Sequence, residues 1–265
     1  MEAKQTAACI NTLGAFCGRR DVPVLTRDAL RRRYGFAQAD VMVLFGGSIL
    51  CGVGVLAEAM AENVARRYVI VGGEGHTTAA LREKIHLRFP SVETEGASEA
   101  ELFQKILGLQ YGRKADALET RSTNCGNNIT FLLELLAQKR MEARSILLCQ
   151  DATMQRRMDA GLRKVCPPAT VVINYAAYAA TVVPGGEGLR FAADIEGMWE
   201  MERYLSLLLG EIPRLRDDEN GYGPRGKNFI AHVDIPAETE EAFRALQTEY
   251  GGLARQANPL FRTRE

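Results

Sequence analysis

Short apolar runs that end in glycine or polar residues alternate with longer helical segments over the first two thirds of the chain. The runs have the length of buried strands, and the longer segments have helical periodicity. Strands are predicted at 40–45, 68–71, 91–94, 117–119, 145–149 and 169–174, and helices at 5–18, 26–34, 53–67, 77–89, 99–107, 127–140 and 151–165. Strands that alternate with helices indicate βαβ units, so we expect an α/β fold with a mostly parallel sheet. Ser98 and Glu101 have the spacing of a capping box at the start of the helix at 99–107.

The pattern changes after residue 188, where the regular alternation stops. An amphipathic helix is predicted at 195–212, a polar, turn-rich loop at 213–226, a short strand at 229–233 and a last helix at 236–250. We therefore predict N-terminal helices at 1–36, an α/β core at 37–190 and a smaller, mainly helical C-terminal subdomain at 191–265.

Charge, cysteine content and hydropathy narrow the class of protein. The 33 Lys and Arg balance 33 Asp and Glu, whereas a general nucleic-acid or membrane-surface binder would carry a basic excess. The six cysteines form no Cys-x-x-Cys pair and no signal-peptide pattern is present, so we expect a reduced, cytoplasmic protein. The uncharged stretch 41–57 is short and glycine-rich, which favours a strand, a turn and a helix start over a membrane span.

A glycine-rich segment, Gly72-Gly73-Glu74-Gly75-His76-Thr77-Thr78, follows the predicted strand at 68–71. In an open parallel sheet, ligands bind outside the carboxyl ends of the strands. Glycines there let the backbone approach a ligand closely, and the helix that starts at Thr77 would offer unpaired N–H groups to an anion or a carboxylate. The same residues also suit an ordinary tight turn with a threonine cap, so both interpretations stay open.

A second polar loop, Glu119-Thr-Arg-Ser-Thr-Asn-Cys-Gly-Asn-Asn128, follows the strand at 117–119. Ser122, Thr123 and Asn124 are all helix-cap formers, and Arg121 can approach an anionic group. A helix cap needs only one of these side chains, so their number favours a ligand-binding loop.

A third segment, Gln150-Asp151-Ala-Thr-Met-Gln-Arg-Arg157, follows the strand at 145–149. Asp151 either caps the next helix or binds a hydroxyl or an amine of a ligand. Arg156 and Arg157 lie one helical turn further on, and we expect at least one of them on a solvated face.

Two further sequence patterns are weaker evidence for a binding site. Gly52-Val-Gly54-Val-Leu-Ala57 fits a dinucleotide-binding pattern with Glu74 about 20 residues on, but Gly52 comes too late after its strand. The three histidines have no metal-ligand spacing, so no metal is expected. We expect His86 on a helix surface and His232 in a structural role. The candidate catalytic residues are His76, Glu74 and Asp151.

The three loops together resemble the YdcF-like group of the bacterial DUF218 domain family. The matching runs are Gly-Gly-x-Gly-His-x-Thr from residue 72, Glu-x-x-Ser-Thr-Asn-Cys-Gly-x-Asn from residue 119 and Gln-Asp-x-Thr-Met-Gln-Arg-Arg from residue 150. C-terminal runs match as well, including Glu202-Arg-Tyr-Leu-Ser-Leu-Leu and Gly221-Tyr-Gly-Pro-Arg-Gly. The resemblance covers most of the chain from about 40 to 236. Asn127 is a departure, because the family usually has Glu there.

The resemblance implies a Rossmann-like, three-layer αβα core that binds S-adenosylmethionine and belongs to a cytoplasmic protein. The ligand site that it implies includes residues from four loops. These are Gly46, Gly47, Gly72, Gly73, Gly75, His76, Thr77, Glu119, Ser122, Thr123, Asn124, Asn128, Asp151 and Arg156.

Three functions stay open at this point. The first is a protein that binds S-adenosylmethionine, with transfer to an acceptor that the sequence does not identify. The second is an enzyme for phosphate esters such as nucleotides, sugar phosphates or cell-envelope intermediates, suggested by the helix-start loops and by Arg121, Arg156 and Arg157. In such an enzyme Glu74, Glu119 or Asp151 would be the candidates to hold Mg²⁺. The third is a non-catalytic sensor or interaction module that docks through the loop at 213–226. In each case we expect a small-molecule or protein partner, and neither nucleic acid nor a membrane span.

Overall fold

The structure is a computed structural model that describes residues 1–47, 49–75, 77–186 and 188–253. The chain forms two compact units, each assembled from several stretches of sequence. Unit 1 contains Met1–Arg19, Ala152–Cys166 and 178–253, and unit 2 contains Arg20–Asp151 and Pro167–Ala177. The division of the sequence at residues 36 and 190 stays a prediction.

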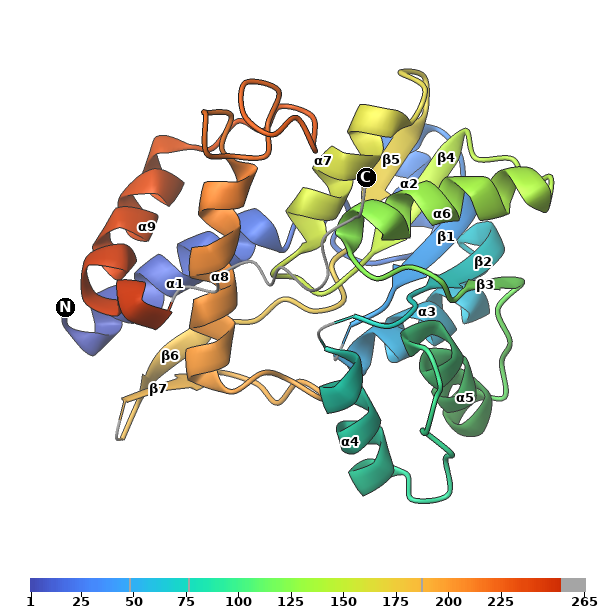
Figure 1. Cartoon of the computed structure of the whole chain (residues 1–265), viewed down its shortest axis with the longest axis horizontal. Coiled ribbons are helices and arrows are strands. Elements are labelled where there is room, and N and C mark those ends of the chain that lie inside the picture. The colour runs from blue at the N-terminus through green and yellow to red at the C-terminus, as the bar shows by residue number, and fades with distance from the viewer. Residues whose placement is uncertain (48, 76, 187, 254–265) are drawn as a thin grey trace. The chain divides into compact units, whose positions relative to one another are not determined.

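A five-stranded parallel sheet forms the centre of unit 2 (Figure 1). Its strands are β1 (Ala39–Phe45), β2 (Ala65–Val71), β3 (Ala117–Glu119), β4 (Ser145–Cys149) and β5 (Val171–Asn174). They lie in the order β3-β2-β1-β4-β5, and each neighbouring pair is parallel. The central strands β1 and β4 are buried along their whole length, which explains their mostly apolar sequences. Their polar residues, Asp40 and Ser145, are buried as well and hydrogen-bond to each other.

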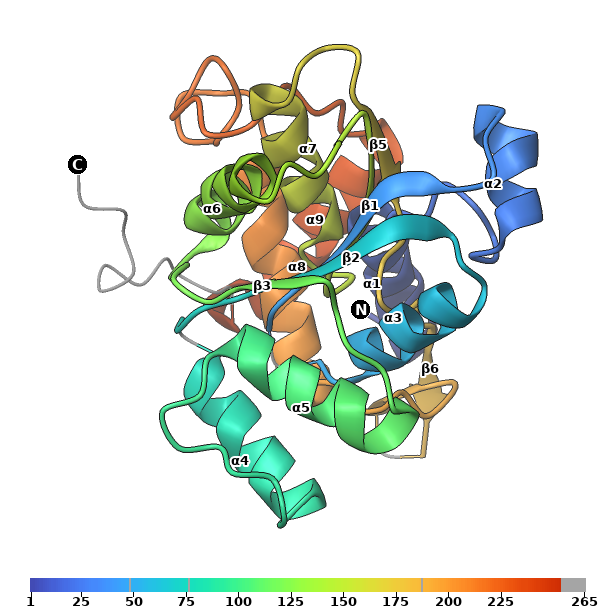
Figure 2. The ribbon, with the colours of Figure 1, turned by 90° about the vertical axis from the view of Figure 1, so that its right-hand side faces the viewer.

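Helices cover both faces of this sheet. Helices α3 (Cys51–Ala61) and α5 (Glu99–Tyr111) pack on one face, and α6 (Cys125–Gln138) packs on β3 from the other side (Figure 2). The usual right-handed crossovers produce this distribution, because the connections on either side of β1 run in opposite directions across the sheet. Unit 2 also contains α2 (Arg27–Tyr34) and α4 (Thr78–Arg88). The expected Rossmann-like, three-layer α/β fold is confirmed.

The connection between β1 and β2 differs from the predicted one. The sequence pattern extended the helix to Arg67, but α3 ends at Ala61 and β2 begins at Ala65. Asn63 adopts a positive φ of 53°, which interrupts the helix, and Ala65 then pairs with Ala39 of β1. The first part of β2 carries exposed arginines, so its polar sequence hid the strand.

Two predicted strands are wrong. Residues 91–94 form turns, in which the Val92 N–H donates to the carbonyl of Phe89. Residues 229–233 form no strand either, because their N–H groups do not pair with a neighbouring strand. Phe229 and Ile230 both donate to the Tyr222 carbonyl, and Ala231 donates to the Ala160 carbonyl.

Unit 1 is mainly helical and contains a small hairpin. Its helices are α1 (Ala3–Cys17), α7 (Gln155–Val165), α8 (Met201–Leu215) and α9 (Ala237–Tyr250), followed by a short 3₁₀ turn, η1 (Gly251–Leu253). Helix α1 packs against α7, α8 and α9. The hairpin of β6 (Val182–Gly185) and β7 (Gly188–Phe191) is antiparallel and was not predicted. Asn11 of α1 bonds both backbone groups of Val182, at 2.7 and 2.8 Å, and so fixes the hairpin.

Helix starts in unit 1 also lie later than predicted. Helix α8 begins at Met201 rather than residue 195, because Gly197 has a φ of 70° and ends a turn over 195–198. Helix α7 begins at Gln155 after Met154, so Asp151 does not cap it. The predicted apolar residues Leu205, Leu208, Leu209 and Ile212 of α8 are all buried. The amphipathic pattern is only part of the description, because every residue from 204 to 212 is buried, Ser206 and Glu211 included.

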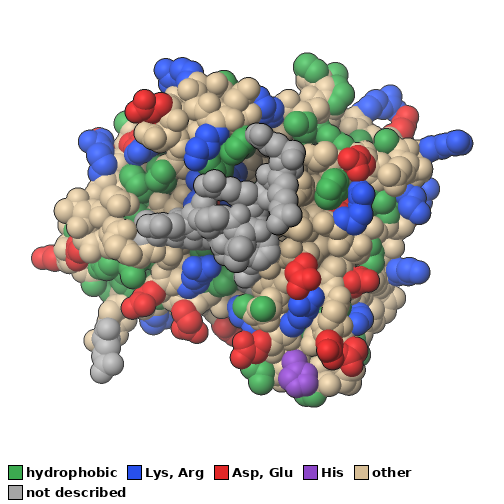
Figure 3. All heavy atoms as spheres, in the orientation of Figure 1, with side chains coloured by type: hydrophobic (Ala, Val, Ile, Leu, Met, Phe, Trp, Pro, Cys, Tyr) green, Lys and Arg blue, Asp and Glu red, His purple; other side chains and the backbone are tan. Residues whose placement is uncertain are grey.

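The distribution of surface charge and the state of the cysteines agree with the expectations from the composition. Acidic and basic side chains are intermixed over the visible face rather than gathered into one patch (Figure 3). All six cysteines lie among the described residues, and each is a free thiol. Within the described ranges, no helix combines the length and apolar character needed to cross a bilayer. The stretch 41–57 forms most of β1, a turn and the start of α3, with Ser48 outside the described residues.

Candidate functional site

The loops after β1 and β4 meet where the strand order reverses direction along the sheet. Gly46 and Gly47 follow β1, and Gln150 follows β4. The Gln150 Nε2 donates to the Gly46 carbonyl at 3.2 Å, and its Oε1 accepts from the Asp151 N–H at 2.7 Å. Ligands of open α/β sheets bind at this position, so the candidate site begins here.

The backbone of the glycine loop after β2 is hydrogen-bonded on both sides. The Gly72 carbonyl accepts from the Ala100 N–H at 2.8 Å, and the Gly73 carbonyl accepts from the Glu99 N–H at 3.0 Å. These bonds satisfy the first free N–H groups of α5. On the other side, the Gly73 N–H donates to Ser122 Oγ at 3.1 Å. The loop therefore joins α5 to the loop after β3, which is more than a tight turn requires.

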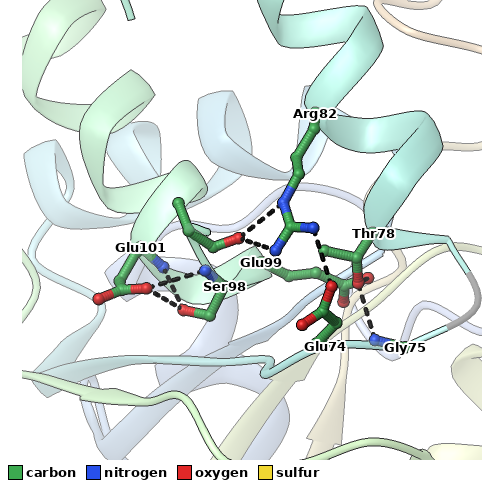
Figure 4. A network of polar contacts seen from close by, with 8 residues as sticks. Glu74, Gly75, Thr78, Arg82, Ser98, Glu99 and Glu101 are labelled. Atoms are coloured by element: carbon green, nitrogen blue, oxygen red, sulfur yellow. Dashed lines mark hydrogen bonds and ion pairs between the residues drawn. The ribbon is translucent and has the colours of Figure 1, made fainter. Parts of the chain in front are cut away.

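Glu99, the first residue of α5, connects this loop to α4. Its Oε1 accepts hydrogen bonds from Thr77 Oγ1 at 3.0 Å and from Thr78 Oγ1 at 2.8 Å. Arg82 of α4 donates to the Ala97 carbonyl and forms an ion pair with Glu74 at 2.8 Å (Figure 4). The two helix starts are thus fixed around one carboxylate.

The Glu99 carboxylate is buried at the ends of β1 and β2. Its side chain lies so close to Gly46 and Gly72 that a methyl group on Gly46 would come within 2.6 Å of Oε2. Burial raises the pKa of Glu99, and the hydroxyls of Thr77 and Thr78 partly oppose that rise. A methyl group would also lie 2.9 Å from Glu99 Cβ at position 46 and 3.0 Å from it at position 72, so the Glu99 side chain favours glycine at both positions. The resemblance had assigned both glycines to a ligand.

Glu119, the last residue of β3, carries a buried carboxylate oxygen that has no hydrogen-bond partner among the described residues. The residue is 3% exposed, and its Oε1 accepts from the Arg121 N–H at 2.6 Å. Within the described part of the chain, no hydrogen-bond donor contacts Glu119 Oε2. A buried carboxylate oxygen without a donor is costly, so such atoms commonly mark a place where a ligand or an ion supplies the missing bond.

Asn124 and Asn127 form a reciprocal cap at the start of α6. Asn124 Oδ1 accepts from the Asn127 N–H at 3.0 Å, and Asn124 Nδ2 donates to Asn127 Oδ1 at 2.9 Å. Thr123 Oγ1 donates to the same Oδ1 at 3.1 Å. Asn127, which departs from the Glu of the resembling family, therefore has a capping role similar to that of Glu in a capping box.

The other predicted site residues are distributed as follows. Asp151 is buried beside Gln150, and Asn128 lies in the first turn of α6. Glu74 is largely exposed and paired with Arg82. His76 lies outside the described residues. Arg156 belongs to unit 1, where it donates to the Phe16 carbonyl and lies 4.1 Å from the centre of the Phe16 ring.

The expectation of a solvated arginine at 156 or 157 is wrong. Arg157 donates to both oxygens of Glu211, one at 2.9 Å, and only 12% of its side chain is exposed. His232 is also not in a strand: it is an exposed loop residue whose ring nitrogens contact Asp217 at 2.7 Å and Asp234 at 3.0 Å. His86 is exposed on α4, as expected.

Glu99 is the residue of this site that the sequence patterns missed. Ser98 and Glu101 form the predicted capping box, which accounts for the helix start without giving a role to the acid between them. The sequence did contain a sign of this role. Glu99 follows the small, apolar Ala97 by two residues, and it is the first residue on the face of α5 that is otherwise apolar and buried. Among the described residues, no group of three or more His, Cys, Asp or Glu could hold a metal ion.

No protein-family model matches the chain. A function can therefore be proposed only from the residues of unit 2 and from the three loop motifs.

Proposed function

We propose that the carboxyl edge of the unit 2 sheet binds S-adenosylmethionine in a cytoplasmic protein of the YdcF-like type. The observation that carries the proposal is the buried Glu119 Oε2, which has no donor among the described residues. A ribose hydroxyl or the methionine ammonium group would supply that donor. The exposed residues Arg121 and Thr123 follow Glu119, so Glu119 lies beside the solvent-facing part of this loop.

The neighbouring groups suit the rest of such a ligand. Gly47 and Gly75 leave little side-chain bulk beside the strand ends, so the backbone there can approach an adenosine closely. When bound, S-adenosylmethionine supplies an activated methyl group. The chain's residues would bind and orient it, and Glu119 would hold one hydrogen-bond donor of the ligand. Transfer to an acceptor is part of the proposal, but no described residue identifies that acceptor.

Titration calorimetry and thermal unfolding of the full chain with S-adenosylmethionine test the proposal. Binding should give saturable heat and should stabilise the protein by about 2.7 kcal/mol at one hundred times the Kd. Glu119→Gln should weaken binding roughly tenfold to a hundredfold, because hydrogen bonds to charged groups are worth about 1.5–3 kcal/mol. Glu95→Gln, an exposed acid in the same unit, removes the same charge and should leave binding unchanged.

The absence of heat and of a thermal shift at millimolar S-adenosylmethionine would refute this function. Titration with AMP and a sugar phosphate under the same conditions separates it from phosphate-ester chemistry. Saturable binding of those compounds alone would transfer the assignment to the second class of enzyme.

A further inference from the structure

We propose that Glu99 is a second ligand-binding acid of this site, and that it selects a hydrogen-bond donor or a cation and rejects an anion. The proposal rests on the proposed location of the ligand site, but it does not require that the ligand be S-adenosylmethionine. Neither a sequence motif nor the resemblance assigns a role to Glu99.

The two carboxylate oxygens of Glu99 differ in the hydrogen bonds that they accept. Oε1 is occupied by the hydroxyls of Thr77 and Thr78, at 3.0 and 2.8 Å. No donor among the described residues contacts Oε2, although the residue is only 7% exposed. Arg82, whose charge acts on Glu99, donates to Ala97 and Glu74 rather than to Glu99 itself (Figure 4). One oxygen is therefore anchored, and the other keeps its capacity to accept a bond.

The Oε2 oxygen lies beside the glycines that follow β1 and β2. A methyl group on Gly46 would lie 2.6 Å from Oε2, and one on Gly72 would lie 3.3 Å from it. Oε2 therefore faces the ends of β1 and β2 at the carboxyl edge of the sheet, where α/β folds bind their ligands. The Gly72 N–H bonds to the Glu119 carbonyl at 2.9 Å, which ties the ends of β2 and β3 together.

The charge of this edge decides which ligand groups suit it. Glu99 and Glu119 each direct acceptor capacity to the same edge of the sheet. The nearest cationic contact of Glu119 is with the exposed Arg121, at 3.9 Å, and Glu99 has no ion pair within the described ranges. Two carboxylates disfavour an anion and favour hydroxyl, amide or ammonium donors. The ligand surface that faces β1–β3 should therefore be a diol or an amine and not a phosphate.

Carbon-13 NMR of the Glu side chains, with Glu99 assigned through Glu99→Gln, tests this inference directly. The probes are S-adenosylmethionine, adenosine, 1,4-diaminobutane and inorganic phosphate, each added to the full chain. We expect at least one donor probe to shift the Glu99 Cδ signal, and phosphate to leave it unchanged. Calorimetry should show that Glu99→Gln weakens that probe at least fivefold, while Glu95→Gln has no effect.

The outcomes separate the two proposals. Failure of S-adenosylmethionine together with a response to adenosine or the diamine would refute the proposed function and support the role of Glu99. Binding of S-adenosylmethionine that neither shifts Glu99 Cδ nor weakens in Glu99→Gln would overturn the role of Glu99 alone. A phosphate response at Glu99, or no response to any probe, would also overturn it. Circular dichroism of Glu99→Gln confirms that the variant is folded before these comparisons are made.

Discussion

Gly73→Ala tests the idea that the glycine loop is clamped between α5 and the loop after β3. A methyl group on Gly73 would overlap the Ser122 carbonyl oxygen, and it would lie 2.7 Å from the Ser122 nitrogen and 2.8 Å from the Arg121 carbonyl carbon. All three are backbone atoms, so no side-chain rotation can relieve the overlap. The loop also cannot retreat, because the Gly73 carbonyl is bonded to the start of α5.

The expected loss of stability follows from these contacts. Overpacking of this kind typically costs about 1–3 kcal/mol. Displacement of the Gly73 N–H from Ser122 Oγ costs about 1 kcal/mol more. We therefore expect Gly73→Ala to lower the free energy of unfolding by about 2–4 kcal/mol, a large share of the roughly 5–15 kcal/mol of an average protein.

Urea unfolding followed by circular dichroism measures this loss as a lower transition midpoint. Gly108→Ala is the matched control, because a methyl group there would lie 3.9 Å from its nearest neighbour, the Arg113 carbonyl oxygen. It should be neutral or stabilise α5 by up to about 1 kcal/mol, since alanine is the better helix former. A Gly73→Ala protein within about 0.5 kcal/mol of the wild type would refute the clamp.

Two further predictions concern buried charges. Burial raises the pKa of Glu99, so the folded protein holds that proton more tightly than the unfolded chain. Between the ordinary Glu pKa of about 4.3 and the raised pKa of the folded protein, the free energy of unfolding of the wild type should fall relative to that of Glu99→Gln as the pH rises. The fall should be about 1.4 kcal/mol for each unit by which the two pKa values differ. Urea unfolding of both proteins from pH 4.5 to 7.5 measures this, and a constant difference would contradict it. Arg157→Met should cost about 3 kcal/mol in thermal unfolding, because the buried Glu211 then keeps only the weaker contact with Arg214, at 3.8 Å. Arg157→Met with Glu211→Met should recover part of this loss, since it removes the buried carboxylate but also the ion pair of Arg214. A single-variant loss below about 1 kcal/mol would contradict the reasoning.

The sheet of unit 2 was predictable because its strands are buried on both faces. The runs at 40–45 and 145–149 are almost wholly apolar, and short apolar runs between helical segments are typical of the central strands of a parallel sheet. The capping box at Ser98 and Glu101 was also correct, since it depends on local spacing alone. The hairpin at 182–191 was missed because its stability depends on Asn11, far away in the sequence.

The candidate site was predictable only in part, for the same reason. The sequence identified the loops after β2, β3 and β4, because glycines and polar residues there follow apolar strands. It did not identify Glu99, whose partners Thr77 and Thr78 lie more than twenty residues earlier. It also did not show that Gly46 and Gly72 accommodate that carboxylate, because only the folded loops bring these residues together.

The way unit 1 is assembled has a consequence for synthesis on the ribosome. Helix α1, at the start of the chain, packs on α9, which begins at Ala237. At a translation rate of about 5–20 residues per second, α1 waits on the order of ten seconds or more for this partner. During that interval α1, which carries the buried residues Ile10, Leu13 and Phe16, lacks one of the helices that pack on it. The strands of the unit 2 sheet all precede Ala177, so this sheet can form before α9 has been synthesised, whereas unit 1 can close only afterwards.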